Sequence, residues 1–309
     1  MITRWVSHPV HKEDTMKAQR WLPILGLALL LAGPAWSRDQ YEDLVKTIPF
    51  EELDELRVEI EIGVADLLVE AVKGNHLLEA DIHYKVDRGE PRIRFERSGR
   101  VGYLTIKSAE SDENDDDGTH VNGLRSGDEN WELRFSPKIP TSFTVDVGLV
   151  DGRLDLSGMK VTDLDISSGL SDLDLYFDEP NPVIMKELRI ECGLGDFKGR
   201  NLGNANFERL RAEGGLGSIV LDLSGQWRVP EADIKVEVGL GSARLEVPAS
   251  LGVEVHAEEN FLASLDLDRH INEVRKGLHR SDNWNRAASK LLIDAEVGLG
   301  SLRIELIPD

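Results

Sequence analysis

A short glycine-containing element recurs along this chain and restricts its fold more than any other feature. Each copy reads Gly, then Leu or Val, then in most cases a small residue, then Asp or Ser. The seven copies occupy residues 63–66, 148–151, 169–172, 193–196, 215–218, 239–242 and 298–301. The four intervals between the second and the sixth copy are 21, 24, 22 and 24 residues. A nearly constant interval is typical of a protein that stacks one structural unit repeatedly.

The residues around each copy alternate between apolar and polar, which is the period of a β-strand. After the copy at 239–242, for example, Ala243 and Leu245 are separated by Arg244 and followed by Glu246. Each unit is therefore predicted to be strand, tight corner, strand. We expect the glycines to allow positive φ and the corner Leu to point inward and cover the end of the core. The last Asp or Ser is expected to accept a backbone N–H that closes the bend.

One such unit cannot bury its apolar face alone, whereas stacked units bury a continuous aliphatic column. We therefore predict an all-β fold. We expect this fold to be a parallel β-solenoid, similar to a right-handed β-helix, with coils of about 22 residues and Gly-Leu-Gly corners. An antiparallel β-sandwich is the alternative, because hairpins also alternate with a period of two. The near-fixed spacing of the corners favours the solenoid.

Residues 1–37 are expected to be a signal peptide. Lys17 and Arg20 precede an apolar run of 12 residues, which is too short to span a bilayer comfortably, and small residues allow cleavage after Ser37. Acidic residues upstream are unusual in such a segment, so translation is expected to begin at Met16. An uncleaved anchor is the alternative. No later run is long enough for a transmembrane span, so we expect a periplasmic or extracellular protein.

After the signal peptide we expect an N-terminal lead-in, 38–55, and a single β-solenoid domain, 56–309. The long interval between the first two glycine elements interrupts the repeat. It is predicted to contain strands at 76–84, 91–95 and 101–107, and then a polar, acidic loop at 109–130.

A second interruption, the insertion 249–294, precedes the last copy. We expect a strand at 252–257 and a helix within 268–292. The helix is predicted from the spacing of Ile271, Val274 and Leu278. The insertion would lie beside the last coil. The C-terminal strand, 302–306, then has two alternatives: it is an open edge that invites a partner strand or self-association, or the insertion covers it.

The charge balance excludes whole classes of partner. The chain has 36 Lys and Arg against 57 Asp and Glu, a net charge of -21. Such a surface repels nucleic acid and anionic lipid headgroups. Hydrophobic residues make up 40% of the chain, which is enough for a core. The single cysteine, Cys192, excludes an intrachain disulfide and a multi-thiolate zinc site, and we expect it to be a small buried residue.

Stacking in register would place one glutamate of each coil in a row, about 4.8 Å from the next. The row consists of Glu191, Glu213, Glu237 and Glu296. Like charges in this arrangement are unfavourable, so solvent and salt, the nearby arginines or a divalent cation must offset them. These arginines are Arg211, Arg244 and Arg303.

Solvated carboxylates with arginine partners are the preferred interpretation of this row. The alternative is a structural Ca²⁺, to which aspartates at the corners would add oxygen ligands. The candidate metal ligands are Asp151, Asp172, Asp196, Glu191, Glu213 and Glu237. No other cofactor is expected.

Four features together are typical of one known family: LRVEIEIG at 56–63, the later GLGS corners, the strand at 76–84 and NWEL at 130–133. Through them the chain resembles, over roughly residues 53–306, the toast-rack family of bacterial envelope proteins. Relatives in that family include extracytoplasmic domains of membrane proteins that respond to cell-wall-active antibiotics, and adhesin-like β-solenoid domains. The resemblance implies a fold and an envelope location. The family has no established catalytic constellation, so no functional residue is carried over. The acidic loop and the missing transmembrane segment depart from the family, which argues against a membrane-embedded signalling role.

No catalytic motif accompanies the repeat. The chain contains no G-x-S-x-G elbow, H-E-x-x-H pair or Walker sequence, and its GxG elements never extend to GxGxxG. Three tryptophans, Trp131, Trp227 and Trp284, could stack sugars but are expected to cover core edges. We therefore predict a non-enzymatic binding or scaffold module of the bacterial cell envelope, with an envelope protein or glycan as partner. The alternatives are an adhesin-like or envelope-stress-sensing component, and a carbohydrate-active enzyme on a β-helix scaffold.

Overall fold

The computed structural model describes residues 40–109, 127–257 and 263–309. The described residues fall within one unit, Asp39–Asp309, and form a single 16-stranded sheet. Within them the only helical segments are two 3₁₀ turns, η1 (Val86–Arg88) and η2 (Leu202–Ala205). The predicted signal peptide and most of the predicted acidic loop lie outside the described residues. No helix within the described ranges is long and apolar enough to cross a membrane.

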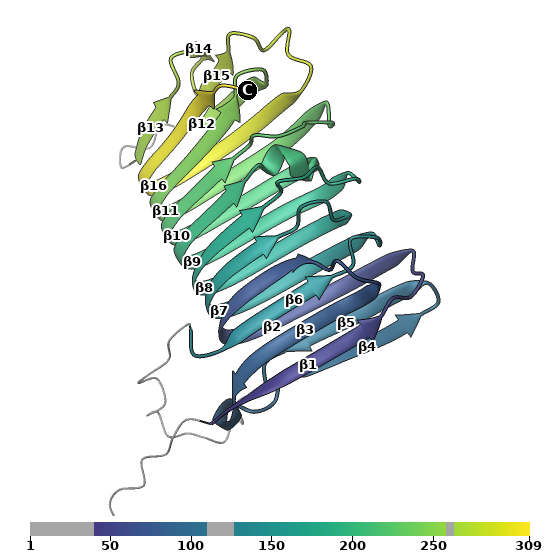
Figure 1. Cartoon of the computed structure of the whole chain (residues 1–309). Helices are drawn as coiled ribbons and strands as arrows, with labels where there is room; N and C mark the ends of the chain where they lie inside the picture. The colour runs from purple at the N-terminus through teal and green to yellow at the C-terminus, as the bar shows by residue number, and fades with distance from the viewer. Residues whose placement is uncertain (1–39, 110–126, 258–262) are drawn as a thin grey trace, which may run out of the picture. The chain divides into compact units, whose positions relative to one another are not determined.

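Seven long strands each carry one glycine element near their middle. They are β2 (Glu55–Ala71), β7 (Thr141–Asp155), β8 (Val161–Tyr176), β9 (Met185–Arg200), β10 (Phe207–Asp222), β11 (Glu231–Pro248) and β16 (Lys290–Ile307). Each pairs in parallel with the next in this order, as Figure 1 shows. The fold is therefore all-β with a long, mostly parallel sheet, and the antiparallel sandwich is wrong.

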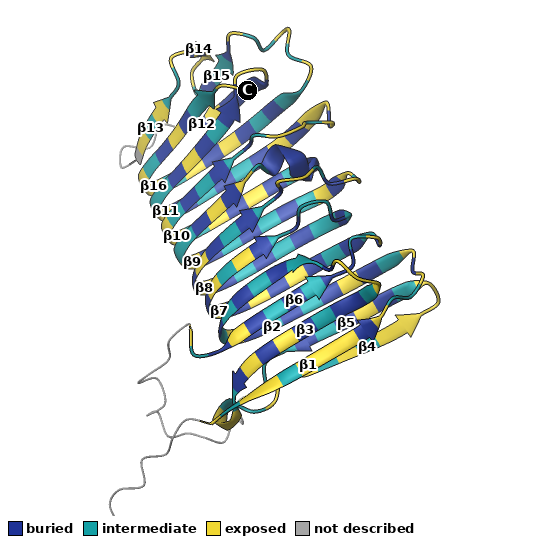
Figure 2. Cartoon of the chain, viewed as in Figure 1, coloured by how far each residue is buried: buried dark blue, intermediate teal, exposed yellow. Residues whose placement is uncertain are grey.

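Burial along each long strand explains why the strand must bend. In β9, Leu188, Ile190 and Cys192 are buried at every second position, but the next buried residue is Phe197, five positions after Cys192. An odd step moves the apolar side chains to the opposite face of a straight strand. The chain therefore has to turn at the glycine element for both arms to face one core. Ile190 and Phe197, one from each arm, belong to the same hydrophobic cluster. Figure 2 shows the alternation of buried and exposed positions.

The second glycine of the element lets neighbouring strands approach closely at the bend. Gly217 has a φ of 141°, and a Cβ built on it would lie 1.8 Å from the carbonyl oxygen of Gly195 on β9. Gly241 and Gly300 meet the preceding strand in the same way, at 2.0 and 1.8 Å. No side chain fits these positions, so glycine is required here by space as well as by backbone conformation.

The N-terminal end is covered by strands from the lead-in and from the first interruption. They are β1 (Tyr41–Pro49), β3 (His76–Lys85), β4 (Arg92–Ser98), β5 (Val101–Lys107) and β6 (Asn130–Phe135). β5 pairs in parallel with the first arm of β2, and β6 with its second arm. β3 and then β1 extend β6 in antiparallel order, and β4 extends β5. The three predicted strands of this region are confirmed, and β1 in the lead-in and β6 bring the total to five.

The insertion caps the other end. It contains β12 (Gly252–Ala257), β13 (Ala263–Leu267), β14 (Ile271–Arg275) and β15 (Leu278–Ser281). β12 pairs with the first arm of β16 and β13 with its second arm. The predicted strand at 252–257 is confirmed. The alternative in which the C-terminal strand is an open edge is wrong, because the insertion supplies its neighbours.

The predicted helix within 268–292 is wrong. β14 and β15 form an antiparallel hairpin instead. Ile271 and Leu278 are buried, one on each strand, whereas Val274 is 57% exposed. Gly277, with a φ of 74°, lies in the turn between them. Two short strands and a turn thus reproduce the spacing that one helical face would show.

Candidate functional site: the corner ridge and the acidic row

The leucines of the glycine elements form one row along the bends. In the parallel register each faces the next, from Leu149 through Leu170, Leu194, Leu216 and Leu240 to Leu299. We call these six residues the corner ridge. Leu149 is partly buried, and the other five have exposed fractions between 43% and 55%.

The prediction that these leucines point inward is wrong. The odd step across the element leaves the first glycine and the leucine outside the core. The residues that close the core at the bend are those on either side, such as Cys192 and Phe197 on β9.

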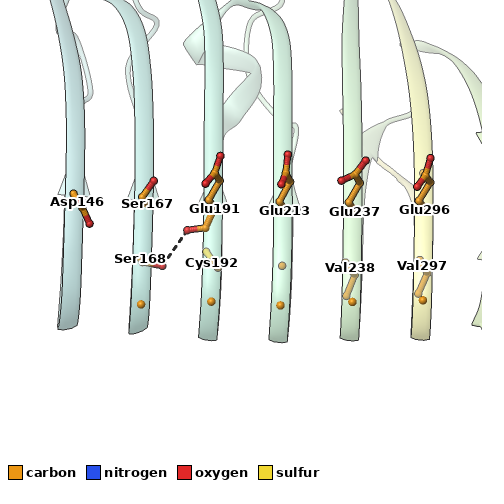
Figure 3. Close-up of a pocket in the computed structure, with 17 residues that line it drawn as sticks. Asp146, Ser167, Ser168, Glu191, Cys192, Glu213, Glu237, Val238, Glu296 and Val297 are labelled. Atoms are coloured by element: carbon orange, nitrogen blue, oxygen red, sulfur yellow. Dashed lines mark hydrogen bonds between the residues drawn. The ribbon is translucent and has the colours of Figure 1, made fainter.

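A row of glutamates runs parallel to the ridge. Glu191, Glu213, Glu237 and Glu296 lie opposite one another on β9, β10, β11 and β16, as the sequence predicts. We call these four residues the acidic row. Figure 3 shows their side chains pointing the same way from adjacent strands. Successive members are therefore separated by about one strand spacing, ~4.8 Å.

Basic residues compensate the acidic row unevenly. The Arg189 Nη1 lies 3.3 Å from Glu191 Oε1, and Lys235 pairs with Glu237. Arg211, one of the arginines expected to offset the row, instead places its Nε 3.0 Å from Glu187 Oε1. Within the described part of the chain, no Lys, Arg or His nitrogen lies within 4.0 Å of the Glu213 carboxylate. Glu213 is therefore an exposed, uncompensated negative charge.

Two of the expected arginine partners serve other carboxylates. Arg244 lies 3.9 Å from Glu246. Arg303 pairs with Asp266 at 2.8 Å and with Glu305 at 3.2 Å. The prediction that these arginines offset the acidic row is therefore wrong: both lie on the arm that follows the bend, and their partners lie on that arm or on β13.

The acidic row lines an open groove of about 1150 Å³. The lining also includes the residue before each first glycine. These residues are small or apolar: Ser168, Cys192, Gly214, Val238 and Val297. Ser168 donates a hydrogen bond from its Oγ to the carbonyl oxygen of Glu191, at 3.4 Å. The groove thus combines a charged side with a side of low polarity.

Cys192 is buried, as predicted. Burial raises the pKa of its thiol, and the hydrogen bond with Ser168 opposes that shift. The thiol is thus protonated at neutral pH, and a protonated, buried thiol is a poor nucleophile.

The corner aspartates link neighbouring strands. Asp172 Oδ1 accepts the backbone N–H of Asp196 at 2.9 Å, and the Ser218 Oγ donates to Asp196 Oδ1 at 2.6 Å. The sequence predicts that each of these side chains accepts a backbone N–H of its own bend. Asp172 does accept a backbone N–H, but that N–H belongs to the neighbouring strand.

The six candidate metal ligands do not gather at one point. Across the described ranges, no group of three or more His, Cys, Asp or Glu side chains could hold a metal ion. In-register stacking explains this, because it separates equivalent carboxylates by a strand spacing each. Asp151 and Asp172 lie opposite each other in the aspartate row of the bends, whereas Glu191, Glu213 and Glu237 stand in the acidic row.

A pair of carboxylates lies at the N-terminal end of the aspartate row. Asp66 on β2 lies opposite Asp151 on β7. The Asp66 Oδ1 is buried and has no hydrogen-bond partner. Burial, and then repulsion from Asp151, raise the pKa of Asp66, while the backbone N–H of Gly127 opposes the shift.

The tryptophans named from the sequence do not line the groove. Trp131 is fully buried, and Trp227 packs on the core while its Nε1 donates to the Leu223 carbonyl at 2.8 Å. Trp284 contacts the cationic groups of Arg280 and Lys290. The ridge is the feature that sequence reasoning missed. The odd interval between flanking apolar positions, such as Cys192 and Phe197, was the available signal.

A family comparison accounts for this architecture. Residues 37–198 match the model described as the N-terminal domain of toast_rack, DUF2154. The match spans more than half of the chain, and the chain belongs to this family. The resemblance seen in the sequence is thereby confirmed. A search of curated proteins found no match.

Solved structures with a similar course of the chain include two bacterial proteins named for adhesion. A candidate cell adhesion protein from Clostridium sporogenes is 16% identical, with 87% of this chain and 100% of that chain covered and a TM-score of 0.47. A candidate adhesin from Bacteroides fragilis is 11% identical, with 85% and 97% covered and a TM-score of 0.37. A candidate lipid-binding protein from Parabacteroides distasonis is 12% identical, with 86% and 96% covered and a TM-score of 0.26.

Proposed function

We propose that this protein is an exported, non-enzymatic binding module of the bacterial cell envelope, and that the corner ridge with its acidic row is the binding surface. The observation that carries the proposal is the ridge itself. Five leucines with exposed fractions between 43% and 55% stand in register on consecutive strands of the ladder. Contiguous exposed apolar patches on soluble proteins mark interaction sites more often than scattered apolar residues do.

The physical reason is the cost of hydrating this row. Burying a leucine side chain fully is worth ~1.5–3 kcal/mol, and a half-exposed leucine has roughly half of that still to gain. Five neighbouring leucines can therefore supply several kcal/mol to a partner that covers them together. The parallel ladder holds them in place before binding, so little conformational entropy is lost.

The arrangement of carboxylates supports a binding role over catalysis. A hydrolase on a solenoid would need acids of different environments brought together at one place. Along this groove the same glutamate recurs in register from β9 to β16, one strand spacing apart, and the acids are not gathered at one place. The envelope location rests on the family and on the signal-like segment of residues 1–37.

Site-specific photo-crosslinking in the native cells tests the proposal. A photo-reactive amino acid is placed at Leu216 on the ridge or, as a control, at Ile184, which is 52% exposed and lies outside the ridge. We expect a discrete adduct from position 216 in the envelope fraction and none from position 184. Equal labelling at both positions, or none at 216, would contradict a binding role for the ridge.

A further inference from the structure

We infer that the partner of the corner ridge is a basic, amphipathic α-helix of another protein, lying along the ridge and across the strands. This inference rests on the proposed function and names the chemistry of the occupant.

The spacing of the rows fits a helix better than an extended peptide. Adjacent strands lie ~4.8 Å apart, and one turn of an α-helix rises ~5.4 Å, so successive turns stay close to successive leucines. Same-side residues of an extended strand repeat every ~6.8 Å and lose register after two steps. The ridge from Leu149 to Leu299 crosses five strand spacings, ~24 Å, which a helix of ~16 residues covers.

The charge beside the ridge selects a basic partner. Glu213 and Glu296 are exposed, and in the described part of the chain neither has a Lys, Arg or His nitrogen within 4.0 Å. Lys235 also interacts electrostatically with Glu296, but it pairs with Glu237. Lys or Arg side chains on one flank of an incoming helix would neutralise these carboxylates while its leucines cover the ridge. The open groove of about 1150 Å³ that the acidic row lines provides room for these basic side chains.

The same charges disfavour two other occupants. A second copy of this chain seated on the ridge would bring a second acidic row against the first, and like charges at close range cost free energy. An anionic lipid surface would be repelled for the same reason, and the chain carries a net charge of -21. The same negative charge that disfavours a second copy and an anionic lipid surface attracts a cationic helix.

Fluorescence anisotropy with a synthetic peptide tests this inference. The peptide has 16 residues of Leu and Lys, with the leucines at i, i+3, i+4 and i+7 so that one helical face is apolar. A scrambled peptide of the same composition and a peptide with Glu in place of Lys are the reference ligands. We expect the first peptide to bind at least tenfold more tightly than either reference. Equal binding of the scrambled peptide would overturn the helical geometry.

Variants of the protein locate the binding. Leu194→Ser with Leu216→Ser should weaken binding at least tenfold, and Glu213→Gln with Glu296→Gln at least fivefold with a shallower salt dependence. The matched controls are Ile184→Ser and Glu208→Gln, exposed positions outside both rows, which should leave binding unchanged. All the substituted side chains are exposed or half-exposed, so folding is expected to persist. Equal effects of control and ridge variants would overturn the inference.

The remaining outcomes separate the inference from the proposed function. Concentration-dependent dimerisation that Leu216→Ser abolishes, or stronger binding to anionic vesicles than to the peptide, would overturn the helical partner. Absence of peptide binding together with a specific adduct at position 216 in cells would also overturn the inference but leave the binding function standing. Absence of both would overturn the binding function itself.

Discussion

Glu213 lies directly opposite Glu237 on the neighbouring parallel strand, and the two carboxylates are compensated differently. Lys235 pairs with Glu237, whereas the arginine nearest in sequence to Glu213 contacts Glu187 on the other side. The register that builds the core thus also brings like charges together. This regularity leaves electrostatic repulsion between neighbouring carboxylates at the surface. Solvent and salt reduce the repulsion, and a cationic partner would remove it.

Neutralising Glu213 should therefore stabilise the protein. We expect Glu213→Gln to raise the free energy of unfolding by ~0.2–1 kcal/mol at low ionic strength, with a smaller gain in high salt. The control is Glu237→Gln, which removes the ion pair with Lys235 and should give no gain. Urea denaturation at two salt concentrations measures both variants. A destabilised Glu213→Gln protein would show that this side chain has a favourable partner after all.

The close approach of strands at the bend should make the second glycine irreplaceable. In Gly217→Ala the new Cβ would lie 1.8 Å from the Gly195 carbonyl oxygen, at a φ of 141°. We expect a loss of more than ~2 kcal/mol of stability, because backbone must shift and strain remains. Gly63→Ala is the control, because a Cβ there meets nothing within 4 Å, and it should change stability by less than ~1 kcal/mol. Thermal unfolding compares them, and similar melting temperatures would argue against so close an approach of the two strands.

Asp66 should lower the free energy of unfolding by an amount that depends on pH. Burial and the nearby Asp151 raise the pKa of Asp66, so the folded state retains the proton to higher pH than the unfolded state. Stability linked to this group is therefore highest at low pH and falls as pH rises from the ordinary aspartate pKa through the raised one.

Asp66→Asn removes that titration. We expect the variant to be more stable than the natural protein at pH 7, and the difference to vanish near pH 3. Asp233→Asn, at an exposed position on β11, is the control and should show no such trend. Chemical denaturation between pH 3 and pH 7 supplies the data. A difference in stability between the two proteins that grows towards low pH would contradict a raised pKa of Asp66.

Local periodicity was sufficient to predict most of the strands. The ranges 101–107 and 252–257 agree with β5 and β12. β5 buries alternate residues, whereas β12 is buried at five of its six positions, so its polar residues still marked the strand although they are not all exposed. Periodicity failed at Ile271, Val274 and Leu278, where a hairpin turn places apolar residues at helical intervals.

The site was only partly predictable for a different reason. The register of the acidic row follows directly from equal spacing, so Glu213 opposite Glu237 could be predicted. Whether Leu216 points outward depends on which residues face the core on either side of the bend. The alternation of apolar and polar residues alone does not show this. The partner of Arg211 also depends on a side-chain choice between Glu187 and Glu213 that the sequence leaves open.

The bends of consecutive strands stack into one straight ridge, and a distance measured across that ridge shows whether they do. Spin labels are attached to Leu149→Cys and Leu299→Cys, in a Cys192→Ser background, and the distance between them is measured by pulsed electron spin resonance. We expect a single narrow distribution centred near five strand spacings, ~24 Å between the backbones. A broad distribution, or one centred beyond ~35 Å after allowance for the labels, would contradict the stacked ridge.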